Sequence, residues 1–406
     1  MVRGTSSLPE EVYSRPWGGF DFVYTMGDNA QLPPVFQKPM YSEESGRSNT
    51  ADNVGRIVVS DFLTGSTDNT VKSSVVVMDQ VLRQDDTSYL DLLERMANGT
   101  LESADVAFIV GKCLDKATEN TRQSFEQAIH LVPTWKMAHP IVIAYLNKLV
   151  TPVAKINAQY KSMLSGITNH CVKGPLPERL AICVGAKVML LRNFVVEYKL
   201  MNGCVGVVKQ IVYKTSSGPA NKDELPAYVI VDFPSNTIPQ EDALVPNMPA
   251  TCVPVPVVDD NCEKRCCSVR AIPLRVCIAI SIHKSQGMTI GPGEVFEKVV
   301  VYLPEGQREQ NPGLELVAFS RAKGPDCLAV GNNSNNLTIM SIQKIGTSEK
   351  NKLRRSFQQK LKALSLTTQT ATVESITKLH AVNMDTEKTF EGGCKFLLDW
   401  FNSKLT

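Results

Sequence analysis

Apolar positions in the first half of the chain fall into short strand-like runs that alternate with helical patterns. An apolar run at 20–26 is followed directly by a turn. Asp86 precedes residues Leu90, Leu93 and Met96, whose spacing predicts one face of a helix with Asp86 as its N-cap. Another apolar run at 128–134 predicts a strand, and 141–149 predicts the helix after it. Strands that alternate with helices favour a doubly wound α/β layer.

The pattern changes at about residue 175. Apolar residues then alternate in short runs without helical spacing, and Asn202-Gly203 is a strong signal for a turn between strands. This pattern of short alternating runs predicts a small, mostly β insert up to about residue 265. The α/β pattern returns with apolar runs at 276–280 and 299–303, a helix over 312–321 and a strand over 327–330.

The last segment, from about residue 341, predicts a basic helical tail. Residues 350–362 contain six basic side chains and no acidic one. Leu353, Phe357 and Leu361 recur at helical spacing, so the segment predicts a basic amphipathic helix. A solvated surface helix is the ordinary reading of such a charge run, and a contact to nucleic acid is the alternative.

Composition and charge narrow the function classes. The chain has 406 residues, 43% of them hydrophobic and 21% charged, which fits two or three globular domains. Its net charge of only +2 places any affinity for nucleic acid in local basic patches. No run approaches the roughly 20 apolar residues of a membrane span, and the start lacks a signal-peptide core. Eleven cysteines without such a signal predict reduced thiols in an intracellular protein.

Two loops offer groups that suit a nucleotide. Residues 27–35 read GDNAQLPPV, a stiff loop that presents the amide of Gln31 directly after a strand. At that edge of an open α/β sheet ligands bind. Residues 282–289 read IHKSQGMT and also follow an apolar run. Their hydroxyl, ammonium and backbone amide groups suit a phosphate, which we favour over an ordinary helix start.

Two arginines occur in settings that suit a phosphoryl-transfer enzyme. Arg83 follows an apolar run, and Arg321 ends the sequence VAFSR. A guanidinium that completes a nucleotide site on closure stabilises the charge of the transition state. A surface ion pair is the ordinary alternative for either residue taken alone.

Together these segments resemble the petite-integration-frequency (Pif) helicases, which are RecD-like DNA helicases of superfamily 1B. Residues 27–35 resemble helicase motif III, 81–84 motif IV, 282–289 motif V and 317–321 motif VI. Residues 131–134 with 145–147 match a second-lobe pattern. Residues 184–193 with 202–208 are similar to the family's 2B insert. The resemblance covers about 16–332 in the family's order and spacing.

The resemblance implies an ATP-dependent 5′-to-3′ DNA helicase with P-loop NTPase-like (RecA-like) lobes, which uses ATP and Mg²⁺ on single-stranded or forked DNA. The residues it would assign to catalysis are Arg83, Arg321 and Gln31. The residues it would place at the nucleotide are Gln31, Arg83, Gln286, Gly287 and Arg321, and those at the DNA are Thr134, His283, Lys284 and Ser285. The family setting implies a nuclear or mitochondrial protein if the organism is eukaryotic. We expect a monomer without a membrane partner.

The sequence also departs from the family pattern. Asn29, Ala30 and Phe319 are mild substitutions within the motifs. The loop Gly-x-x-x-x-Gly-Lys-Ser/Thr does not occur in the sequence. The Asp-Glu pair that holds Mg²⁺ in the family should lie shortly before residues 27–35, and it is missing there. We therefore expect an N-terminally truncated helicase whose ATP turnover is near background. The alternatives are a catalytically inactive module that binds single-stranded DNA and a relic of a mobile element.

The expected organisation has five parts, and none is expected to hold a metal. Cys252, Cys262, Cys266 and Cys267 are irregularly spaced, which favours a reduced loop over a zinc site. The predicted parts are a remnant of the first RecA-like lobe with a polar loop (1–70), the first part of the second lobe (71–175), the β insert (176–265), the second part of the second lobe (266–340) and the tail (341–406).

Overall fold

The computed structural model describes most of the chain from residue 81 onward and short stretches before it. The described residues are 27–33, 39, 41, 75–78, 81–162, 176–215, 218–219, 221, 223–261, 267–304, 312–332, 334–337 and 339–383. The chain divides into two compact units. The first contains residues 1–33 and 82–351, and the second contains 34–81 and 352–406.

A four-stranded parallel sheet forms the α/β part of the first unit. Its strands run in the order β12 (Ala279–Ser281), β1 (Ile129–Val132), β13 (Val299–Val301) and β14 (Leu328–Val330). Nearly every residue of these strands is buried, which explains their continuous apolar runs. Helix α6 (Trp135–Lys148) follows β1 directly and packs against β1 and β12. The predicted α/β lobe is therefore confirmed.

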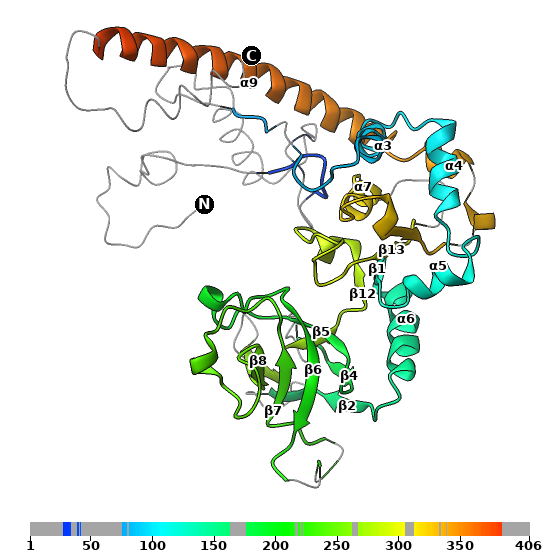
Figure 1. Ribbon diagram of the computed structural model, residues 1–406, viewed down its shortest axis with the longest axis vertical. Coiled ribbons are helices and arrows are strands. Elements are labelled where there is room, and N and C mark those ends of the chain that lie inside the picture. Colours follow the sequence, from blue (N-terminus) through cyan, green and yellow to red (C-terminus); the bar gives the residue numbers. More distant parts are fainter. Residues whose placement is uncertain are drawn as a thin grey trace. The chain divides into compact units, whose positions relative to one another are not determined.

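Further helices surround this sheet (Figure 1). Asp86 caps α3 (Thr87–Asn98), as predicted, because its carboxylate accepts a hydrogen bond from the Tyr89 amide. Gly99 ends this helix in the left-handed conformation at φ 65°. The other helices of this part are α4 (Ser103–Gly111), α5 (Glu119–Ser124), α7 (Leu314–Phe319) and α8 (Ile339–Gln343), with short 3-10 helices η4 (Ile282–Ser285), η5 (Pro325–Cys327) and η6 (Ser334–Asn336).

The predicted β insert is built from antiparallel sheets. The five-stranded sheet has the order β11 (Leu274–Val276), β5 (Lys187–Leu190), β6 (Val205–Val212), β7 (Tyr228–Asp232) and β8 (Cys252–Pro256). A three-stranded sheet contains β3 (Gln159–Ser162), β10 (Cys267–Ala271) and β9 (Val258–Asn261), and β2 (Ala154–Asn157) pairs with β4 (Arg179–Ile182). Two 3-10 helices, η2 (Val196–Tyr198) and η3 (Gln240–Asp242), lie in its loops.

The sequence pattern predicted a single strand at 276–280, and this prediction was wrong. The run splits at Cys277-Ile278, because β11 pairs antiparallel with β5 while β12 pairs parallel with β1. Antiparallel pairing therefore begins at β2, before residue 176, and continues through Val276, beyond residue 265. Every residue of 276–280 is buried, so the hydropathy pattern gave no sign that the chain changes sheets there.

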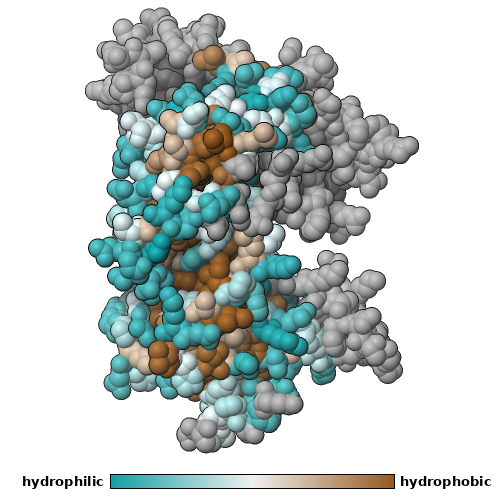
Figure 2. Space-filling view, turned by 90° about the vertical axis from the view of Figure 1, so that its right-hand side faces the viewer, coloured by the Kyte–Doolittle hydropathy of each residue, from teal (hydrophilic) through white to brown (hydrophobic). Residues whose placement is uncertain are grey.

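One contiguous set of buried side chains runs through the first unit. It includes Leu131 and Val301 of the parallel sheet as well as Val208, Val229 and Val255 of the five-stranded antiparallel sheet. The α/β part and the insert thus share a hydrophobic core. Some large apolar side chains remain exposed, and Figure 2 shows such side chains gathered in patches between polar ones.

The second unit holds the larger part of α9 (Glu349–Asn383), so the predicted tail helix is confirmed. Within this unit, the backbone amide of Val77 donates a hydrogen bond to the Ser365 hydroxyl at 3.1 Å. Whether the basic face of α9 contacts nucleic acid stays a prediction. None of the helices among the described residues is long and apolar enough to cross a membrane.

Candidate nucleotide and nucleic-acid site

The loop at 27–33 is organised around the carboxylate of Asp28. One carboxylate oxygen accepts a hydrogen bond from the Ala30 amide at 2.8 Å, and the other accepts one from Gln31 Nε2 at 3.0 Å. Side chains of this type commonly hold tight turns in this way. The Gln31 amide predicted at this loop is therefore tied to Asp28. The strand-like run before it, 20–26, lies outside the described residues.

Gly313 lies against this loop from the other end of the sequence. Gly313 is the N-cap of α7 and adopts φ 82°, a conformation that favours glycine. A Cβ atom built on it would be 2.6 Å from the Ala30 carbonyl oxygen, which is too close for any side chain. The backbone of the 27–33 loop thus packs directly on the first turn of α7.

Arg321 follows the other end of α7 and is only 1% exposed. Its guanidinium donates hydrogen bonds to the Val317 carbonyl at 2.9 Å, to the Ser320 hydroxyl at 2.9 Å and to the Met288 carbonyl at 3.4 Å. Burial, followed by the neighbouring charge of Arg83, lowers the pKa of Arg321 to about 10, while Asp28 acts in the opposite direction. The side chain stays charged at neutral pH.

Arg83 reaches the same place from the segment before α3. It donates hydrogen bonds to the Thr289 hydroxyl and to the Ser320 carbonyl, both at 3.2 Å. The neighbouring Gln84 donates from its amide to the carbonyls of Ser320 and Ala322, each at 2.9 Å. The structure therefore gathers two arginines and the Asp28 loop, which are separated by up to 293 positions in sequence (321 − 28).

A second group of predicted residues lies at the carboxyl edge of the parallel sheet. Thr134 follows β1 and is the exposed N-cap of α6, and η4 follows the adjacent strand β12. In the loop at 282–287, His283 is half-buried, while Lys284, Gln286 and Gly287 are exposed. Because β1 and β12 are parallel neighbours, their carboxyl ends share one edge, where open α/β sheets bind ligands.

Ser285 is the exception in this group. It is fully buried, and its hydroxyl donates a hydrogen bond to the Ile282 carbonyl at 2.7 Å. Its hydroxyl therefore stabilises the turn and does not face solvent. Gly287 beside it adopts φ 84°, which suits the sharp exit of the chain from this turn.

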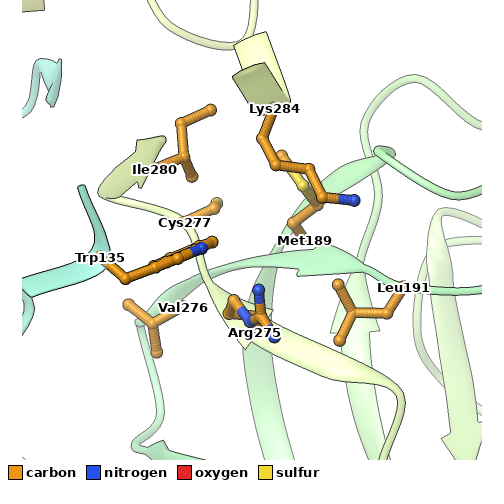
Figure 3. Close-up of a pocket in the computed structure, with 8 residues that line it drawn as sticks. All are labelled: Trp135, Met189, Leu191, Arg275, Val276, Cys277, Ile280 and Lys284. Atoms are coloured by element: carbon orange, nitrogen blue, oxygen red, sulfur yellow. The ribbon is translucent and has the colours of Figure 1, made fainter. Parts of the chain in front are cut away.

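A shallow hollow adjoins this edge and brings in residues that the sequence analysis did not assign. Figure 3 shows Trp135 on one side, Lys284 from η4 above, Arg275 from β11 below and Leu191 opposite. The Arg275 guanidinium carbon lies 4.7 Å from the centre of the Trp135 ring, which is a cation–π contact. Burial lowers the pKa of Arg275 from its usual value. The sequence signal for this hollow was a tryptophan directly after Thr134.

Comparison with known proteins finds relatives of this chain in sequence and in fold. The chain is 23% identical over 330 residues to the human "ATP-dependent DNA helicase PIF1" and 25% identical over 318 residues to the protein of the same name from Danio rerio. A crystal structure of Pif1 helicase from Candida albicans superposes with a TM-score of 0.56 at 22% identity, over 86% of this chain and 70% of that chain. The chain is similar to the Pif1 helicases in sequence and in fold. The predicted resemblance is confirmed.

The matches to these relatives cover only part of each relative's length. The alignments with the human and zebrafish Pif1 helicases cover 75% of this chain and 42% of each relative, so the chain spans about two fifths of their length. No protein-family model matches the chain. The expected RecA-like fold class is confirmed by the likeness to the Pif1 crystal structure.

The predicted cysteine loop lies partly outside the described residues. Cys262 and Cys266 are not described, while Cys252 and Cys267 are both buried. Within the described part of the chain, no three histidine, cysteine or acidic side chains come together as a metal-binding group. The nature of the 262–266 loop stays a prediction.

Proposed function

We propose that this chain supplies the second motor lobe of an ATP-dependent DNA helicase of the Pif type, which moves 5′-to-3′ on single-stranded or forked DNA. The observation that carries the proposal is the convergence of Arg83 and Arg321 on Ser320, beside the loop that holds Gln31. The likeness to curated helicases over three quarters of the chain supports it.

The two arginines suit a triphosphate. Burial is the main cause of the lowered pKa of Arg321, and the positive charge of nearby Arg83 lowers it further. A γ-phosphate between them would relieve the repulsion between the two charges and would accept hydrogen bonds from both guanidinium groups. Bound ATP would supply the phosphoryl group. Arg321 would have to leave its main-chain partners to reach it, while Gln31 would sense the γ-phosphate and Gln286 and Gly287 would line the nucleotide side. We assign no described residue to Mg²⁺.

The DNA would pass along the carboxyl edge of the parallel sheet. Thr134 and Lys284 are exposed there and His283 is half-buried. They offer a hydroxyl, an ammonium and an imidazole group, which are ordinary partners of a phosphate backbone. Ser285 would act indirectly, by holding the turn that presents His283 and Lys284.

Binding of single-stranded DNA tests this part of the proposal. We expect the affinity for a labelled oligonucleotide, measured by fluorescence anisotropy, to fall as salt rises. Lys284→Gln should weaken binding for all sequences and reduce the salt slope by about 1, because one phosphate contact is lost. Lys214→Gln, which removes an exposed cation after β6, should change neither quantity. A binding curve unchanged by salt would contradict the proposal.

Nucleotide binding and DNA unwinding test the two other parts of the proposal, ATP dependence and the direction of movement. A fluorescent ATP analogue should bind more weakly to Arg83→Ala and to Arg321→Ala than to the wild type. Forks with either a 5′ or a 3′ single-stranded tail distinguish the two polarities of movement. A chain that binds single-stranded DNA but neither binds nor hydrolyses ATP is the binding module of our alternative hypothesis.

A further inference from the structure

We infer that the hollow between Trp135, Arg275 and Lys284 binds one base of single-stranded DNA and the phosphate attached to it. The hollow lies where the parallel sheet meets the antiparallel insert, with Trp135 from α6, Arg275 from β11 and Lys284 from η4 (Figure 3). This inference rests on the proposed function and adds to it a base-binding position built on Trp135 and Arg275, which lie outside the segments that resemble helicase motifs.

The first argument is the surface that the hollow offers to a flat ring. Trp135 is 46% exposed although tryptophan is usually well buried, and its ring is held in place by the Arg275 guanidinium. Bases of single-stranded nucleic acids stack both on aromatic rings and on arginine planes. The stacked pair of Trp135 and Arg275 presents both kinds of surface together.

The second argument is the distribution of charge. The interior is apolar, formed by the buried side chains of Met189, Leu191 and Ile280. The two charged residues that line the hollow, Arg275 and Lys284, are both cations. An apolar interior with cations at its rim fits an uncharged ring joined to a phosphate. A cationic ligand would be repelled by the rim, and a strongly polar group placed in the apolar interior would lose its solvation without a partner.

The third argument is position. Trp135 directly follows Thr134, and Lys284 is part of the loop for which we propose DNA contacts. A strand that follows the carboxyl edge of the sheet from Thr134 to Lys284 passes the mouth of the hollow. The hollow is shallow, so a base would lie on its surface against Trp135 and Arg275 and would not be enclosed by it. Only a base that leaves the stack of its neighbours can do so, which favours single-stranded over double-stranded DNA.

Fluorescence of Trp135 gives a direct test. The sequence contains two other tryptophans, Trp17 and Trp400, so a variant with Trp17→Phe and Trp400→Phe reports on Trp135 alone. We expect a dT oligonucleotide to quench this emission as it saturates the protein. Binding that is detected by anisotropy on a labelled oligonucleotide but leaves the Trp135 emission unchanged would overturn the inference.

Affinity measurements give a second test. Loss of one base stack should make Trp135→Ala bind dT oligonucleotides about tenfold more weakly, or worse, while Trp135→Phe should retain most of the affinity. Tyr228→Ala, which removes a partly exposed ring from β7, is the matched control and should bind normally. If the defect of Trp135→Ala arises from stacking, it should shrink on an oligonucleotide of abasic sites.

The outcomes separate this inference from the proposed function. Wild-type binding that depends on salt and on Lys284, with equal affinity in Trp135→Ala and no quenching, would retain the helicase proposal and overturn the base site. A wild-type protein that binds no single-stranded DNA in low salt would overturn both. An equal defect of Trp135→Ala on normal and abasic oligonucleotides would also overturn the base site, because the ring would then act through folding and not through stacking.

Discussion

His130 lies on β1 with most of its surface removed from water. Its Nδ1 atom is 3.2 Å from the Tyr302 hydroxyl, and the two rings are 5.8 Å apart. Burial, with a smaller contribution from the charge of Lys148, lowers the pKa of His130 to about 4. The imidazole is therefore neutral in the folded protein at pH values where an unfolded chain would begin to protonate it.

This difference makes stability depend on pH. Because the pKa is lower in the folded than in the unfolded state, the unfolded chain binds the extra proton first as the pH falls below about 6.5. We expect the free energy of unfolding to decline between about pH 6.5 and pH 4, by up to about 3 kcal/mol from this group. Urea unfolding of wild type and His130→Asn at several pH values measures it. Equal pH slopes in the two proteins would rule out His130 as the cause.

At the scale of elements, the start of α4 is linked to the end of α3 by one carboxylate. Asp105 accepts a hydrogen bond from the Glu102 amide at 2.9 Å and two from Arg95, at 2.7 and 2.8 Å. The Asp105 side chain is 5% exposed, whereas that of Arg95 is 32% exposed. The hydrogen bond from Arg95 is the main cause that lowers the pKa of Asp105. The pair thus fixes the angle between two helices as well as capping one of them.

Asp105→Asn should therefore destabilise the protein by about 1–3 kcal/mol at neutral pH, because an ionised acceptor of three hydrogen bonds is lost. The folded pKa is depressed, so this stabilisation is complete above the unfolded value of about 4 and declines as the pH falls below it. Urea unfolding at pH 7 and at pH 3 should show the difference between wild type and variant shrinking. Glu94→Gln on the exposed face of α3 is the control and should have little effect.

At the scale of the whole molecule, one hydrophobic core is shared by the α/β part and the antiparallel insert of the first unit. Buried residues of the parallel sheet and of the antiparallel sheets form one contact network, and residues 276–280 pass from one sheet to the other while fully buried. The chain enters the insert after α6 and leaves it through β11. Neither part can lose its packing without exposing apolar surface of the other.

We therefore expect both parts to unfold together. Val229→Ala on β7, a fully buried position in the insert, should cost roughly 2 kcal/mol because it leaves a cavity. Amide hydrogen exchange should then become faster by a similar factor in β7 and in β1, although β1 belongs to the parallel sheet. Faster exchange confined to the insert strands would show two independent cores.

The sequence predicted the strands and the capped helices well because their signals are local. Asp86 and Gly99 specify the ends of α3 by their own chemistry, and the buried runs of β1 and β13 follow from hydropathy. The start of α6 at Trp135 was missed because Pro140 within the helix reads as an interruption. The change of sheet at Cys277 depends on contacts between distant segments, and no local pattern encodes it. Trp135 is a local signal for the hollow, but the sequence pattern does not show that Arg275 and Lys284 join it.

Gly313 has a consequence for how this protein tolerates change. The Ala30 carbonyl occupies the space of any side chain at position 313, and the φ angle there is itself unfavourable for other residues. In a library of random substitutions selected for folding, position 313 should therefore accept almost nothing but glycine. Positions 30 and 31 should accept other side chains in such a library, because only their main-chain atoms contact Gly313. Their backbone conformation should be retained. A single hydrogen atom, where every other amino acid has carbon, thus sets how near two segments 282 positions apart can come (313 − 31).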